Sequence, residues 1–263
     1  MDQGKKRRLT RIFRPDNRTV IVPMDHGVTI GPCKGIESMQ TITDQLIKGH
    51  VDAIVVHKGI AKQIEAKNAG LIVQLSGASY LSPSPNTKVQ VCSVQEAIRW
   101  GADAVSVHVN VGAQDEDEML VKLGRVANEC DIFGMPLLAM MYPRGPKITN
   151  EHAHESVAHA ARLGAELGAD IIKTNYTGDA ETFKAVVECC PVPIVIAGGP
   201  KTKTTKDILQ VTAEALKAGS AGVSIGRNVF QQENPTLIVE ALSAIVHDSA
   251  SVQTALNIIG DKN

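Results

Sequence analysis

Eight short apolar runs recur along the 263-residue chain, and a helix-like segment separates each run from the next. The runs are continuously apolar, which is typical of parallel strands that are covered on both faces. Periodic apolar residues at helical spacing are clearest in 155–167 and 207–218. This alternation predicts one α/β domain over residues 1–263, folded as a (β/α)8 TIM barrel. The expected strands are 19–25, 53–58, 71–76, 104–110, 137–142, 170–175, 193–198 and 222–226.

A repeated helix stop supports this organisation. Gly49, Gly101, Gly168 and Gly219 each follow a helix-like segment and precede an expected strand. The stops recur at intervals of roughly 50 residues, or about one for every two strand–helix units. A doubly wound open sheet is the alternative fold, but no G-x-G-x-x-G follows the first strand.

Composition limits the classes of partner. The formal net charge is −1 and 21% of the residues are charged, which argues against a nucleic-acid or membrane-surface role. Basic residues gather only near the start, at 5–8, Arg11, Arg14 and Arg18. We expect residues 1–18 to form a solvated basic arm; an arm that contacts an anion is the alternative.

The cysteines indicate a reducing compartment. There are five, an odd number, and none are in C-x-x-C spacing, so reduced thiols in a cytoplasmic protein are expected. No apolar stretch reaches the length of a membrane span, and the first residues lack an apolar signal core.

Lys173 is the strongest candidate for covalent chemistry. It lies in the expected strand 170–175 with apolar residues on both sides. Burial would lower its pKa from about 10.4 towards neutrality, and an uncharged amine can form a Schiff base with a carbonyl group. Two alternatives are a lysine at a strand end with its ammonium in water, and Lys58, which ends another expected strand, as the nucleophile.

Asp25 and Tyr142 end two further expected strands. Catalytic groups of a TIM barrel come from the carboxyl ends of its strands, and imine chemistry needs groups that move protons. A carboxylate and a phenol beside a lysine could serve. Alternatively, Asp25 caps a helix, accepts hydrogen bonds in a turn or belongs with His26 to a metal site, and Tyr142 is a core aromatic residue.

Glycines follow the last two expected strands. Gly198 and Gly199 follow one strand, while Gly226 precedes Arg227 after the other. Backbone N–H groups at glycine can approach an anion closely, and Arg227 adds a charged donor, so we expect a phosphate site. The alternative is a tight turn, and 76–78 is a further candidate for the same site.

Histidines raise the question of a catalytic metal. His57 and His108 lie near expected strand ends, His26 follows Asp25, and His152 and His154 precede a helix. A catalytic zinc site needs about three converging protein ligands, and a surface or capping role is commoner before a helix. We therefore expect no catalytic metal.

Several of these residues lie in motifs that resemble the archaeal-type class I aldolase family, which includes fructose-bisphosphate aldolase. Within that family the chain is most similar to the 2-amino-3,7-dideoxy-D-threo-hept-6-ulosonate synthases, from about Arg11 to the end. The fructose-bisphosphate branch tends to carry D-Q-G-I-E-H-G-P where residues 25–32 read DHGVTIGP, which favours the synthase branch. The motifs are IVPMDHGVTIGP, AMMYPRG, DIIKTNYTGD, VIAGGPKT and GVSIGRNVFQ.

The resemblance implies a TIM barrel without metal or organic cofactor, in which Lys173 is the Schiff-base lysine, Tyr142 the proton donor and Asp25 the proton acceptor. It also implies a homo-oligomer, for example a decamer. The sugar would contact Asp25, His26, Gly27, Val28, Thr29, Tyr142, Pro143, Arg144 and Lys173, and the phosphate would contact Gly198, Gly199, Gly226 and Arg227.

The implied reaction joins two small molecules, a phosphosugar and L-aspartate semialdehyde. A three-carbon unit of 6-deoxy-5-ketofructose 1-phosphate passes through an imine to the aldehyde, on a route to aromatic amino acids. One alternative is a fructose-bisphosphate aldolase, with Lys201, Lys203 or Arg144 at a second phosphate. Another is a phosphosugar-binding protein without catalysis. The sequence assigns no residue to the carboxylate and ammonium of the semialdehyde.

Overall fold

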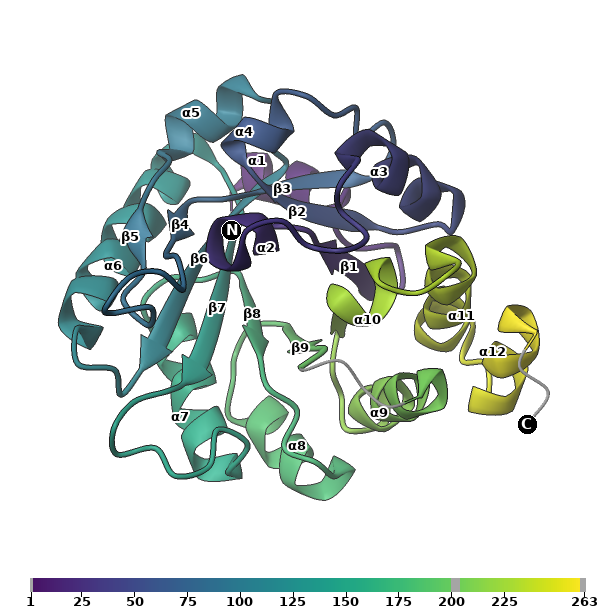
Figure 1. Ribbon diagram of the computed structural model, residues 1–263. Coiled ribbons are helices and arrows are strands. Elements are labelled where there is room, and N and C mark those ends of the chain that lie inside the picture. Colours follow the sequence, from purple (N-terminus) through teal and green to yellow (C-terminus); the bar gives the residue numbers. More distant parts are fainter. Residues whose placement is uncertain (1, 200–203, 261–263) are drawn as a thin grey trace.

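Eight parallel strands form a closed barrel in the computed structural model, which describes residues 2–199 and 204–260 (Figure 1). The strands are β1 (Thr19–Pro23), β2 (Ala53–His57), β3 (Gly70–Gln74), β6 (Ala104–Val111), β7 (Leu137–Pro143), β8 (Ile171–Thr174), β9 (Ile194–Ala197) and β10 (Gly222–Ser224). Their order around the barrel follows the chain, and β1 closes it by pairing with β10 and β2. The predicted (β/α)8 TIM barrel is confirmed.

Helices cover the outside of the barrel, and those predicted at 155–167 and 207–218 are confirmed with slightly shifted ends (Figure 1). No helix in the described part of the chain is long and apolar enough to cross a membrane. The helices are α1 (Gln3–Leu9), α2 (His26–Ile30), α3 (Met39–Lys48), α4 (Lys58–Ala61), α5 (Val94–Arg99), α6 (Glu116–Phe133), α7 (His154–Glu166), α8 (Ala180–Glu188), α9 (Thr205–Lys217), α10 (Arg227–Phe230), α11 (Pro235–Asp248) and α12 (Val252–Ile259).

Six of the eight barrel strands end earlier than the apolar runs suggest, whereas β6 and β7 end one residue later. The first was expected to reach Asp25 and the last Gly226, but β1 stops at Pro23 and β10 at Ser224. The chain turns there into the short helices α2 and α10. A small antiparallel hairpin in the loop after β3, β4 (Ser76–Gly77) with β5 (Val89–Gln90), was not expected.

Two apolar layers determine which way each strand residue points. Ile171 belongs to the cluster inside the barrel, whereas Ile172 belongs to the cluster between strands and helices. Successive side chains of a strand face opposite sides. Lys173 therefore points into the barrel, on the same side as Ile171.

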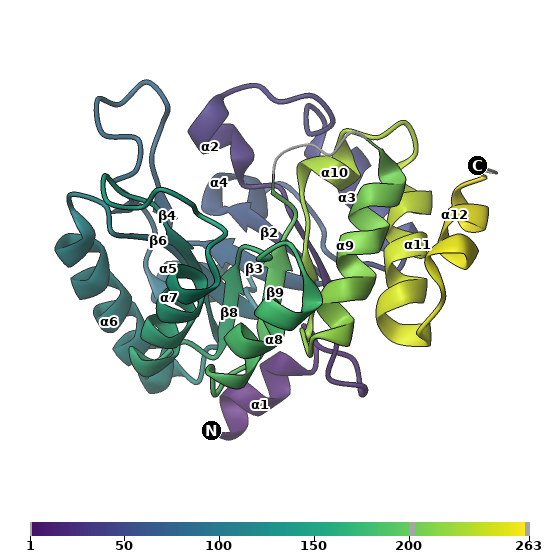
Figure 2. The same cartoon turned by 90° about the horizontal axis from the view of Figure 1, so that it is seen from below.

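The N-terminal segment is not the solvated arm that we expected. Helix α1 lies across one end of the barrel (Figure 2). Lys5 is only 4% exposed, and its ammonium lies 2.6 Å from Asp131 and 2.9 Å from Asp170. Ile12 is fully buried and belongs to the cluster inside the barrel. The segment closes the floor of the barrel.

The partners of the basic residues explain why the expectation failed. Asp52, Asp103 and Asp170 each precede a strand and accept a hydrogen bond from a backbone N–H of the neighbouring strand. Each carboxylate is also paired with one N-terminal cation, so three of the seven basic residues of this segment are neutralised by carboxylates from later in the chain. The cations are, in the same order, Arg14, Arg11 and Lys5.

Candidate active site

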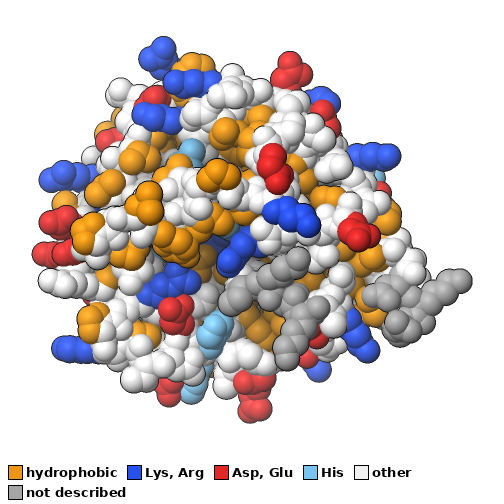
Figure 3. All heavy atoms as spheres, viewed as in Figure 1, with side chains coloured by type: hydrophobic (Ala, Val, Ile, Leu, Met, Phe, Trp, Pro, Cys, Tyr) orange, Lys and Arg blue, Asp and Glu red, His pale blue; other side chains and the backbone are white. Residues whose placement is uncertain are grey.

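A cavity of about 290 Å³ lies at the carboxyl end of the strands, opposite the floor closed by α1. Figure 3 shows lysine and arginine side chains around the hollow at this mouth, with apolar side chains beside them. Most of the predicted site residues line the cavity. They are Asp25, His26, Thr29, Tyr142, Arg144, Lys173, Gly198, Gly199, Gly226 and Arg227.

Three predicted substrate-binding residues do not line this cavity. Gly27 and Val28 border a separate hollow beside α2 and α4. Pro143 is buried at the end of β7, where it follows Tyr142 and so points to the other side of the strand. The turn into α2 thus takes Gly27 and Val28 away from the cavity, and strand alternation does the same for Pro143.

Lys173 reaches the cavity from β8 and is only 6% exposed. Burial is the main cause that lowers its pKa, to about 8; the nearby Asp25 carboxylate opposes this shift and Arg144 adds to it. Desolvation penalises the charged form of an amine. An ordinary lysine is almost entirely charged at neutral pH, whereas this one has a usable fraction of free amine.

The rival lysines lie elsewhere. Lys58 begins α4, and its ammonium is 3.0 Å from the carboxylate of Glu96, with more than a third of its side chain exposed. It does not line the cavity. Lys201 and Lys203, expected at the rim, lie outside the described residues.

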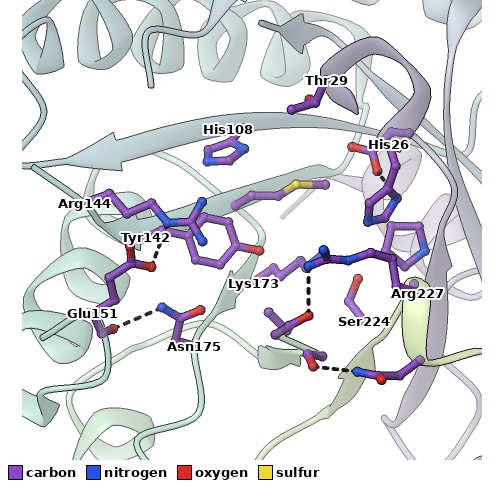
Figure 4. A pocket seen from close by; sticks show the side chains of 18 of the residues that line it. His26, Thr29, His108, Tyr142, Arg144, Glu151, Lys173, Asn175, Ser224 and Arg227 are labelled. Carbon is purple, nitrogen blue, oxygen red and sulfur yellow. Dashed lines mark hydrogen bonds and ion pairs between the residues drawn. The ribbon is translucent and has the colours of Figure 1, made fainter. Parts of the chain in front are cut away.

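Tyr142 lies in the same part of the cavity as Lys173 (Figure 4). Burial raises the pKa of its phenol above the usual range, so the hydroxyl stays protonated and can donate a proton. The ring is held on two sides. The Arg144 guanidinium lies 4.7 Å from the ring centroid, and the His108 ring packs edge-on at 5.0 Å between centroids.

Asp25 follows β1 and makes no side-chain hydrogen bond that caps α2, which removes the capping alternative. Its carboxylate is mostly buried and lines the cavity, 3.7 Å from Nδ1 of His26. Burial lowers the pKa of His26, although Asp25 opposes the shift. Asp25 is therefore a carboxylate that a substrate hydroxyl can reach.

The glycines after β9 and β10 form one wall of the cavity. Arg227 donates a hydrogen bond to the carbonyl of Gly199 at 3.2 Å, which joins the two loops (Figure 4). A Cβ at Gly226 would lie 2.7 Å from the backbone carbonyl oxygen of Pro23, so only glycine fits there without movement. This wall presents backbone and a guanidinium to the cavity, as an anion site requires. The further candidate, 76–78, does not line the cavity.

Several residues that line the cavity were not predicted from the sequence. Asn175 could have been found, because it lies two positions after Lys173 and shares its side of the strand. Ser224 ends β10, and its hydroxyl is buried in the cavity wall without a hydrogen-bond partner among the described residues. Glu151 lies in a loop, and its Oε2 is 2.8 Å from Nε of Arg144. No pattern in the sequence marks it as a site residue.

The histidines do not assemble into a metal site. His152 makes a 2.8 Å hydrogen bond through Nδ1 to the carbonyl of Tyr176, and His108 contacts Asn110 at 2.9 Å. Within 2–199 and 204–260, no group of three His, Cys, Asp or Glu residues could hold a metal ion.

Comparisons with known proteins agree with this geometry. A family model described as DeoC/LacD family aldolase matches residues 19–232. An Archaeoglobus fulgidus protein named 2-amino-3,7-dideoxy-D-threo-hept-6-ulosonate synthase 1 is 44% identical over 261 residues, covering 98% of this chain and 96% of that protein. A Streptomyces griseus protein named 2-amino-4,5-dihydroxy-6-oxo-7-(phosphonooxy)heptanoate synthase is 42% identical over 248 residues, 93% of this chain and 90% of that one.

A solved structure extends the likeness to three dimensions. It is described as an archaeal fructose-1,6-bisphosphate aldolase with its catalytic lysine covalently bound to the carbinolamine intermediate of the substrate. Its TM-score with this structure is 0.87 at 34% identity, and the match covers 92% of this chain and 99% of that chain.

Proposed function

This chain belongs to the DeoC/LacD aldolase family, and we propose that it is a Schiff-base synthase acting on a phosphosugar and L-aspartate semialdehyde. Lys173 is the proposed nucleophile, Tyr142 the proton donor and Asp25 the proton acceptor. One observation carries the proposal: a buried amine with a lowered pKa shares a cavity with a protonated phenol and a carboxylate. Gly198, Gly199, Gly226 and Arg227 would hold the phosphate.

The chemistry begins at the amine of Lys173. It attacks the ketone of 6-deoxy-5-ketofructose 1-phosphate, and loss of water gives an imine that accepts electrons. Asp25 takes the proton of a substrate hydroxyl as the C–C bond breaks, and hydroxypyruvaldehyde phosphate leaves. The three-carbon enamine attacks the aldehyde of L-aspartate semialdehyde, and Tyr142 protonates the new alkoxide. Water then releases 2-amino-3,7-dideoxy-D-threo-hept-6-ulosonate and regenerates the amine.

A fructose-bisphosphate aldolase is the second candidate, because the solved structure of that activity shares this fold and much of the sequence. The two functions share the imine but differ in the aldehyde partner. An assay that offers both substrate sets separately decides between them. We expect the seven-carbon product with L-aspartate semialdehyde; strong cleavage of fructose 1,6-bisphosphate with no use of the semialdehyde would reject the proposal.

The pH dependence offers a second test. With a pKa of about 8, roughly a tenth of Lys173 is free amine at pH 7, against roughly a few parts in 10⁴ for an unperturbed lysine. Because kcat/KM reports groups of the free enzyme, its value for the phosphosugar should rise with pH and level off above about pH 8. An inflection near the ordinary lysine pKa would show that the amine is not desolvated.

We further infer that the chain works in the cytoplasm as one domain over residues 1–263, assembled into a homo-oligomer such as a decamer. The metabolic role of its synthase relative is consistent with this location. Exposed apolar side chains, including Leu81 at 96% and Ile132 at 68%, offer surface for a second copy to cover.

A further inference from the structure

A second cavity of about 660 Å³ adjoins the first at the barrel mouth. Its walls include the loop between β4 and β5, the loop between β6 and α6 and the loop between β7 and α7, and we call it the antechamber. The two cavities are neighbours, because five residues line both. The shared residues are Thr29, Tyr80, His108, Arg144 and Glu151.

Lys88 is the unusual residue of the antechamber. It is 7% exposed, and its ammonium donates a hydrogen bond to the neutral carbonyl of Pro85 at 2.9 Å. Among the described residues, no carboxylate pairs with it. Burial, together with nearby Arg144, lowers its pKa. Buried charges are normally paired, so a lysine held here against its desolvation cost indicates an anion that arrives with a ligand.

Acidic groups face the same space. Glu151 lines the antechamber and binds Arg144, and Asp115 lines it while accepting a hydrogen bond from the hydroxyl of Thr87. One cavity thus presents an unpaired cation and carboxylates. That combination suits a zwitterion, whose carboxylate meets the lysine and whose ammonium meets an acid.

We propose that the antechamber binds an α-amino acid that carries an aldehyde, with Lys88 holding its carboxylate and Glu151 or Asp115 its ammonium. This assignment rests on the proposed function and supplies the subsite for its second substrate. The phosphate wall at Gly199 and Arg227 belongs to the first cavity, so the two anions would be recognised separately. The aldehyde would enter past Arg144 towards the enamine on Lys173.

Steady-state kinetics with two aldehydes test the assignment, at saturating phosphosugar. L-aspartate semialdehyde has the carboxylate, and 3-aminopropanal is its analogue without one. Lys88→Gln should raise the apparent KM for the semialdehyde by about 10-fold to 100-fold, the usual worth of a hydrogen bond to a charged group. The KM for 3-aminopropanal should not rise, since it has nothing to pair with Lys88. Lys88→Arg should recover most of the affinity because the charge is kept.

Lys184→Gln is the matched control, because this lysine is exposed on α8 and paired with Glu188. A comparison on the wild-type protein needs no variant. The KM of the wild-type protein should be higher for 3-aminopropanal than for the semialdehyde. Equal losses of Lys88→Gln with both aldehydes, or no loss with either, would overturn the Lys88 assignment alone. A wild-type protein that does not use the semialdehyde would reject the proposed function, and this assignment with it.

Discussion

Lys173→Ala is expected to abolish covalent capture of the phosphosugar and to lower turnover by on the order of 10⁴-fold or more, as loss of a nucleophile does. The reason is positional: Lys173 is the amine that β8 directs into the cavity, with its pKa lowered to about 8. The measurement is product formation per enzyme, together with the mass of the protein after substrate and borohydride. Lys173→Met keeps a long apolar side chain in the same buried space, so it should give the same result without leaving a cavity.

Lys58→Ala is the matched control for this prediction, since Lys58 directly follows β2 at the same end of the barrel but pairs with Glu96 outside the cavity. It should still form the adduct. If Lys58→Ala lost the adduct while Lys173→Ala kept it, the nucleophile would be misassigned.

Tyr142→Phe should leave the adduct intact while slowing turnover by about 10² to 10⁴, the usual contribution of general acid–base catalysis. Its phenol is buried and stays protonated, so we expect it to deliver a proton rather than to form the imine. The ring packing against His108 and Arg144 is preserved in phenylalanine, which separates the hydroxyl from the fold. The measurement is single-turnover product formation beside adduct mass.

Tyr176→Phe provides the comparison, because the Tyr176 hydroxyl binds Glu214 at 3.1 Å and does not line the cavity. That variant should turn over at close to the wild-type rate. A Tyr142→Phe enzyme of undiminished rate would remove the proton-donor role.

The barrel could be predicted because continuous apolar strands and periodic helices are local patterns. The N-terminal segment could not, because the carboxylates that neutralise Lys5 lie more than a hundred residues away. Charge clusters in a sequence do not reveal their partners. Ion pairs with these distant carboxylates hold the N-terminal segment against the end of the barrel, where a solvated arm was expected.

For the candidate site as well, residues on strands could be predicted from local patterns, whereas residues in turns and loops could not. Lys173 and Tyr142 could be recognised because each lies on a strand whose alternation fixes its direction. Gly27 and Val28 were grouped with Asp25 as one segment, yet the turn into α2 sends them to a different hollow. Loop residues gave no such signal, and Lys88 was overlooked because only tertiary contact buries it.

The proposed chemistry requires that the buried amine of Lys173 captures the ketone of the phosphosugar. The most direct experiment identifies the lysine that carries the adduct. The wild-type protein is incubated with 6-deoxy-5-ketofructose 1-phosphate, reduced with borohydride and digested, and the modified peptide is sequenced by mass spectrometry. We expect a single reduced adduct, on Lys173. An adduct on another lysine, or none under turnover conditions, would contradict it.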